Sequence, residues 1–208
     1  MKSLMKLALI ASAAVCAMQA QALTVTVTAY DGTAATAHSQ VVGAVENTFD
    51  PVTAIGTYSD LSQIVTGTHS YAAQPAGSTG NYLSVGPSGS QPTMQTLTFA
   101  SGASYFGMLW GSPDGYNTFT VTTNLGEFAY TGALITNPAN GNRLISGFAN
   151  FTADSGEFIT GVKWESSSNG FETDNHAVVA VPEPETYALM LAGLAAVGFV
   201  ARRRRADR

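Results

Sequence analysis

The chain has 208 residues, with 14 acidic residues, nine lysines and arginines, and a net charge of −5. The charges are unevenly placed, because residues 23–181 hold eleven acids but only two bases, Arg143 and Lys163, a net charge of −9. Such an acidic body excludes a nucleic-acid-binding protein, which needs a basic surface. These residues suffice for one well-cored domain.

The N-terminus is typical of a secretory signal peptide. Lys2 and Lys6 give it a positive start, and residues 7–18 form an apolar stretch of signal-peptide length. Ala20 and Ala22 form a small-x-small cleavage site. We therefore expect residues 1–22 to form a signal helix, to engage the Sec translocon and to be removed by signal peptidase. The only cysteine precedes this site, so the mature chain is expected to form no disulfide.

Period-two alternation runs through the body, residues 23–180, which is rich in Thr, Ser, Gly, Asn and aromatic residues. Gly- and Pro-containing turns separate the alternating segments. The pattern predicts an all-β fold, a two-sheet antiparallel sandwich of jelly-roll-like kind, with one helical turn at Asp60–Ile64. The expected strands are residues 23–29, 53–58, 63–68, 81–85, 94–99, 104–110, 117–123, 127–131, 144–152, 158–165 and 171–181.

The body shows no pattern typical of an enzyme. His38, His69 and His176 have no His or Cys partner at metal-ligand spacing, so a zinc site is not expected and each histidine is predicted to lie at the surface or in a loop. No G-x-S-x-G elbow in a strand-to-helix context is present. We expect a non-catalytic protein without a cofactor. An extracellular hydrolase is a remote alternative.

A weak calcium site is suggested by Glu172, Asp174 and Asn175, at the start of the last expected strand. Their oxygen atoms suit Ca²⁺, and strict alternation would place Glu172, Asp174 and His176 on one face of the strand. The alternative, which we favour, is a solvated strand face whose Asp and Asn side chains bond to nearby backbone.

Aromatic residues suggest a second kind of site. Trp110 precedes a Gly-Ser-Pro-Asp-Gly turn, which favours an exposed indole, and Tyr116 follows the same turn. Exposed Trp and Tyr rings stack on the apolar faces of sugars, so both residues are candidate glycan contacts. The alternative is that these rings pack in the core, which is their ordinary role in a sandwich.

Residues 181–208 form a distinct tail. The triplet Pro182, Glu183 and Pro184 opens it, and its prolines favour an extended, accessible chain. An apolar run at 187–201 follows, then Arg202, Arg203, Arg204 and Arg205. A helix over that run is about 22 Å long, short of the roughly 30 Å hydrocarbon core. Local thinning closes that gap, and the positive-inside rule holds the arginines in the cytoplasm. We expect a single membrane-spanning helix; the alternative is an amphipathic or buried C-terminal helix.

The order of export signal, Pro-Glu-Pro triplet, apolar helix and arginine cluster resembles the PEP-CTERM family of Gram-negative bacteria. The resemblance covers about residues 181–205. It implies that an exosortase, a membrane protease-transpeptidase, recognises Pro182, Glu183 and Pro184, and it implies a link to exopolysaccharide or biofilm matrix. The expected protein is exported, held in the inner membrane transiently, and then located at the cell surface or outside the cell. A carbohydrate-binding module for exopolysaccharide is the alternative function.

Overall fold

The structure is a computed structural model that describes residues 23–62, 64–88 and 93–182, with positions 189, 190, 192–194 and 197 of the tail. The described body consists mostly of antiparallel strands, which confirms the all-β prediction. Its elements are β1 (Thr24–Ala29), α1 (Ala34–Ala37), β2 (Val45–Asn47), β3 (Thr57–Tyr58), β4 (Ile64–Thr66), β5 (Asn81–Val85), β6 (Met94–Gly111), β7 (Asn117–Thr123), β8 (Glu127–Thr131), η1 (Gly132–Leu134), β9 (Ser146–Thr152), β10 (Ile159–Ser166) and β11 (Phe171–Ala180).

The expected and observed strands agree best after residue 80, where the alternating segments are long. The helical turn predicted at Asp60–Ile64 is wrong for its described residues. There the Asp60 carboxylate accepts hydrogen bonds from the Ser62 N–H and hydroxyl, both at 2.8 Å, and this local turn competes with helix formation. β2 and α1 were not predicted, since three and four residues are too few to show a period.

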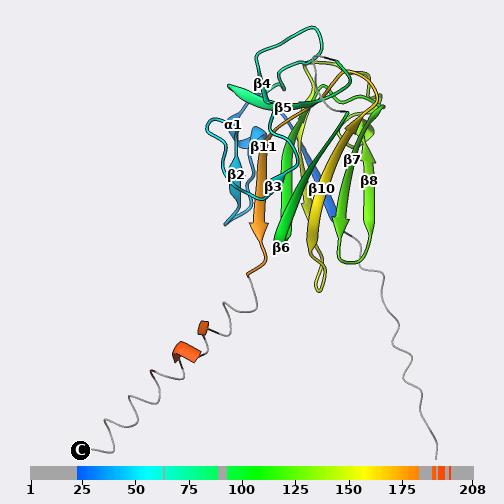
Figure 1. Ribbon diagram of the computed structural model, residues 1–208. Coiled ribbons are helices and arrows are strands. Elements are labelled where there is room, and N and C mark those ends of the chain that lie inside the picture. The colour runs from blue at the N-terminus through cyan, green and yellow to red at the C-terminus, as the bar shows by residue number, and fades with distance from the viewer. Residues whose placement is uncertain are drawn as a thin grey trace, which may run out of the picture.

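All the strands in the described residues join in one 11-stranded sheet whose central order is β4-β5-β11-β6-β10-β7-β8 (Figure 1). β6 belongs to two parts of it. Its residues 94–98 and Ala103 pair with β10, whereas residues 103–111 pair with β11 on one side and residues 105–111 pair with β9 on the other. β6 turns back between these halves, where Gly102 adopts a positive φ of 76°. The sheet thereby folds over on itself.

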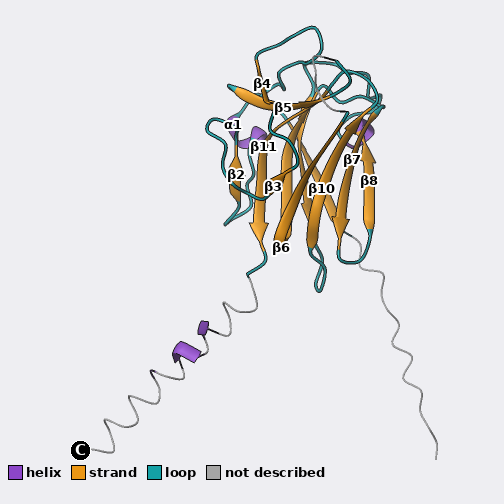
Figure 2. Ribbon diagram, viewed as in Figure 1, coloured by secondary structure: helices purple, strands orange, loops and turns teal. Residues whose placement is uncertain are grey.

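The core lies between the two folded-over parts and is dominated by aromatic rings. Phe119 of β7 packs on Phe151 of β9 with ring centroids 4.9 Å apart, although these strands are not hydrogen-bonded neighbours. Trp164 of β10 lies 5.9 Å from Phe106 of β6, and its indole N–H donates to the Met108 sulfur at 3.2 Å. Figure 2 shows that strands make up most of the body and that loops gather at its upper end.

A second apolar cluster lies on the outer face of β6, β9 and β11, where Ala37 of α1 packs over Tyr105, Leu109, Phe148 and Ala177. These strands are therefore buried on both faces near their middle. Alternation of apolar and polar residues is weak there for that reason.

Both ends of the body lie at the same end of the fold, the lower one in Figure 1. Thr24, which opens β1, pairs with Thr152, and Thr152 pairs with Tyr105 near the turn of β6. Ala180, which closes β11, pairs with Ala103 at that same turn. The loops at the upper end are thus the part of the body farthest from the chain ends.

Candidate functional site

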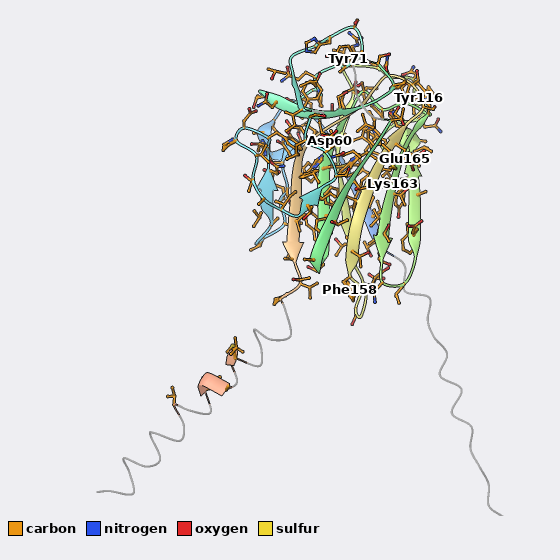
Figure 3. All side chains as sticks on the ribbon, viewed as in Figure 1. Asp60, Tyr71, Tyr116, Phe158, Lys163 and Glu165 are labelled. Carbon is orange, nitrogen blue, oxygen red and sulfur yellow. The ribbon has the colours of Figure 1, made fainter. Side chains whose placement is uncertain are left out.

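A polar hollow of about 200 Å³ lies among the upper loops, and we call it the distal pocket. Four segments that are distant in sequence form its wall: the loop before β5, the turn after β6, the loop before β9 and the loop between β10 and β11. Its lining includes Tyr71, Asp114, Tyr116, Asn140, Arg143 and Asn169, with Glu172 of β11. Figure 3 shows Tyr71 and Tyr116 at this end and Phe158 at the opposite one.

Glu172 anchors the wall of the distal pocket. Its side chain is buried, one carboxylate oxygen accepts the Ser112 hydroxyl at 2.6 Å, and the other accepts the Ala73 N–H at 3.0 Å. Burial raises the pKa of this carboxyl to about 6, against the opposing effect of these two bonds. Because both oxygens are engaged, Glu172 ties the loop before β5 to the end of β6.

The turn after β6 presents Asp114 and Tyr116 to the pocket. The sequence Ser112-Pro113-Asp114-Gly115 favours a turn, and the Asn117 side chain closes it by accepting the Asp114 N–H at 2.9 Å. The Tyr116 hydroxyl donates to one Asp114 carboxylate oxygen at 2.7 Å and also contacts the Asn169 carbonyl. These bonds fix the tyrosine ring, which is 37% exposed.

A bulge in β11 falls within the predicted calcium site, at Asn175. The pairing with β6 shifts between Asp174 and Ala177, and Asn175 adopts a positive φ of 50°. Asn175 donates its amide to the Ala37 carbonyl at 2.8 Å, while Glu172 belongs to the distal pocket. In the described part of the chain no group of three or more His, Cys, Asp or Glu residues is placed to hold a metal. The calcium prediction therefore gains no support.

His176 is a core residue, so its predicted surface position is wrong. The bulge adds one residue, which turns His176 away from the side of Glu172 and Asp174 and into the core. Its ring is fully buried, stacks on Trp164 at 4.8 Å, and meets the hydroxyls of Tyr58 and Thr173 at 2.8 Å each. Burial lowers the pKa of His176 to about 3, so the imidazole is neutral.

The other two histidines differ from each other. His69 is exposed, as predicted, and stacks on Tyr71 with ring centroids 5.2 Å apart. His38 is partly buried beside Glu46, with its Nδ1 2.8 Å from the carboxylate. Neither belongs to a group of three or more His, Cys, Asp or Glu residues that could hold a metal within the described part of the chain.

Trp110 takes the alternative position, in the core, so its prediction as a glycan contact is wrong. Its indole is 0% exposed and stacks on Phe171 at 4.5 Å. Both faces of β6 are covered at this point, so the neighbouring turn does not bring the ring to the surface. Trp110 is therefore unavailable as a glycan contact, whereas Tyr116 remains accessible at the distal pocket.

Sequence reasoning found Tyr116 but missed Asn140, Arg143 and Asn169 as members of one site. They come from separate loops, and no linear pattern connects them. The turn that holds Asp114 was the only local signal, and it indicated a turn rather than a pocket.

The start of the tail is accessible. The last backbone hydrogen bond of the body joins the Val181 N–H to the Gly102 carbonyl at 3.1 Å, and Pro182 directly after it is exposed. Glu183, Pro184, Arg202–Arg205, the cleavage site at Ala20 and Ala22, and much of the helix predicted at 187–201 lie outside the described residues. Among the residues that are described, no helix has the length and apolar character needed to cross a membrane.

Comparison with known proteins identifies the tail. The family model of the PEP-CTERM protein-sorting motif matches residues 180–205. No curated protein and no solved structure matches the chain significantly. The match confirms the resemblance read from the tail, and it leaves the body without a relative that names an activity.

Proposed function

We propose that this chain, which carries a PEP-CTERM protein-sorting motif at residues 180–205, is an exported surface or matrix protein that an exosortase processes. The motif match is the observation that carries the proposal. It begins at the last residue of β11, so the sorting segment follows the folded body directly.

The junction between body and tail suits a processing enzyme. Proline has no N–H for a β-ladder, so β11 cannot continue hydrogen bonding through Pro182. Pro182 is exposed just after the last backbone bond at Val181. A transpeptidase can thus bind the Pro-Glu-Pro triplet without unfolding the sheet.

The body would be held close to the membrane before processing. The six residues from Val181 to Thr186 span at most about 20 Å when extended. Because β1 begins and β11 ends at the same end of the fold, that end would face the membrane. The distal pocket would then face away from it.

Each predicted partner takes part in one step of export and sorting. The signal peptide engages the Sec translocon and is removed by signal peptidase, the helix at 187–201 holds the protein in the inner membrane, and exosortase releases or transfers it to the surface. The body acts without catalysis in this proposal. Two packed layers joined by β6 support the finer assignment to a jelly-roll-like sandwich.

The test is to replace Pro182, Glu183 and Pro184 together by alanine in the producing cells and to fractionate them. We expect the variant to accumulate unprocessed in the inner membrane. A Glu185→Ala variant is the matched control, because it removes the neighbouring carboxylate outside the triplet and should be sorted normally. Unchanged surface display of the triple variant would refute the proposal.

A further inference from the structure

The distal pocket is lined by several polar side-chain groups that have no hydrogen-bond partner among the described residues. One oxygen of Asp114 accepts the Tyr116 hydroxyl, while its other oxygen has no hydrogen-bond partner among the described residues. The side chains of Asn140 and Arg143 likewise have none there, although both line the pocket. The remaining carboxylate, on Glu172, is fully engaged with Ser112 and Ala73.

A glycine keeps the Asp114 carboxylate open to the pocket. Gly141 has a positive φ of 70°, and a Cβ on it would lie 2.8 Å from both Asp114 oxygens. Any side chain there would occupy the space beside the carboxylate. The Asp114 backbone also forms a bridge with Asn140, so the carboxylate and the amide are held together by paired backbone.

These groups indicate the chemistry of a ligand. A free carboxylate oxygen, an amide and a guanidinium supply acceptors and donors for neighbouring hydroxyls, and the Tyr116 ring offers an apolar surface beside them. A divalent cation is disfavoured, because Asp114 is the one lining carboxylate with a free oxygen. A phosphate is disfavoured, because the carboxylates of Asp114 and Glu172 outnumber the one guanidinium of Arg143. An apolar ligand is disfavoured as well, because it would bury polar groups without giving them hydrogen-bond partners.

The size and position of the pocket narrow the class further. Its volume of about 200 Å³ is below the roughly 300–1,000 Å³ of pockets for drug-sized ligands. We propose that the distal pocket binds a single sugar unit of a glycan, with Asp114, Asn140 and Arg143 bonding its hydroxyls and Tyr116 packing on its ring. The pocket lies at the end of the body opposite the tail, so a glycan reaches it from the side that faces away from the membrane.

Saturation-transfer NMR on the full chain tests this sugar-binding proposal. The chain is held in lipid nanodiscs, so that no detergent with a sugar head group is present. The probes are the methyl glycosides of glucose, galactose, mannose, N-acetylglucosamine and glucuronic acid, each at millimolar concentration. At least one should receive saturation at its ring protons. Asp114→Asn and Arg143→Ala should each weaken that binding at least tenfold.

Lys163→Ala is the matched control for Arg143→Ala. It removes the same charge from the only other base of the body, which lies on β10 beside Glu165, away from the distal pocket (Figure 3). It should leave binding unchanged. Thermal unfolding of each variant checks that the fold is retained, and Arg143→Ala meets this check most easily because its side chain is exposed.

Three results would overturn the proposal: no glycoside of the panel binds, both pocket variants bind as the wild type does, or Lys163→Ala weakens binding as much as Arg143→Ala. The experiment does not depend on tail processing. Its outcome is therefore separate from that of the sorting test.

Discussion

Replacing Asp174 by asparagine should change how the stability of the body depends on pH. Asp174 is 1% exposed, and one of its oxygens accepts the Asn175 N–H at 2.7 Å. Its other oxygen is buried without a hydrogen bond; the Ser78 hydroxyl is close enough to favour the charged form but does not reach hydrogen-bond geometry. Burial raises the pKa of Asp174 from 3.8 to about 7, and the charge of Asp50 adds to this while that of His38 opposes it.

The size of the effect follows from these two pKa values. Between pH 3.8 and about 7 the folded protein keeps a proton on Asp174 that the unfolded chain has released, so stability falls as the pH rises through this window. At about 1.4 kcal/mol per pKa unit, the step from pH 5 to pH 8 costs the wild type about 2–3 kcal/mol. Asparagine has no such step, so Asp174→Asn should gain this amount relative to the wild type between pH 5 and pH 8.

Urea unfolding of residues 23–182 at pH 5, 6, 7 and 8 measures the difference. Glu165→Gln is the control, because Glu165 is a surface carboxylate whose side chain is 39% exposed, and its curve should stay parallel to that of the wild type. If the Asp174→Asn curve is also parallel to the wild-type curve, Asp174 is ionised in the folded protein throughout, and the reasoning from its burial is wrong.

Three further substitutions test the core. His176→Phe should cost about 1–3 kcal/mol of stability at pH 7.5, because the Tyr58 and Thr173 hydroxyls lose a hydrogen-bond partner. Between pH 6.5 and pH 4, however, the variant should lose less stability than the wild type. The wild-type imidazole stays neutral in the folded protein but becomes charged in the unfolded chain, so acid favours unfolding of the wild type. An equal acid loss in both proteins, measured by urea unfolding, would contradict this. Trp110→Ala should cost about 3–5 kcal/mol in the same assay, and a cost below 1 kcal/mol would mean that the indole is not buried. Asn175→Ala should cost about 1–3 kcal/mol through its positive φ and the lost bond to Ala37, with Asn175→Gly milder; equal costs would leave the backbone strain without support.

Features that depend on local sequence were predicted well. Strands such as β7 and β10 show long alternation because each has neighbours on both edges and one face toward the core. The tail was recognised for a similar reason, since a sorting motif is read as a linear segment. Its confirmation at residues 180–205 needed no knowledge of the body.

Features that depend on distant contacts were not predicted. The bulge at Asn175 is stabilised by the carbonyl of Ala37, which lies 138 residues away in sequence. Strict alternation takes no account of this bulge, so it places His176 on the wrong face of β11. The turn after Trp110 favoured an exposed ring, but the ring packs in the core on Phe171 of β11 and Phe119 of β7. The distal pocket escaped notice because its residues meet only after the upper loops are packed.

The most direct test of exosortase processing is mass spectrometry of the mature protein and its carboxyl end, in producing cells with and without their exosortase. If an exosortase processes the chain, the mature protein begins at Leu23 and has lost the apolar helix and the arginines, cut or joined at or near Pro182, Glu183 and Pro184. The tail stays intact when the enzyme is absent. Surface protein that still ends at Arg208 in cells with the enzyme would contradict exosortase processing.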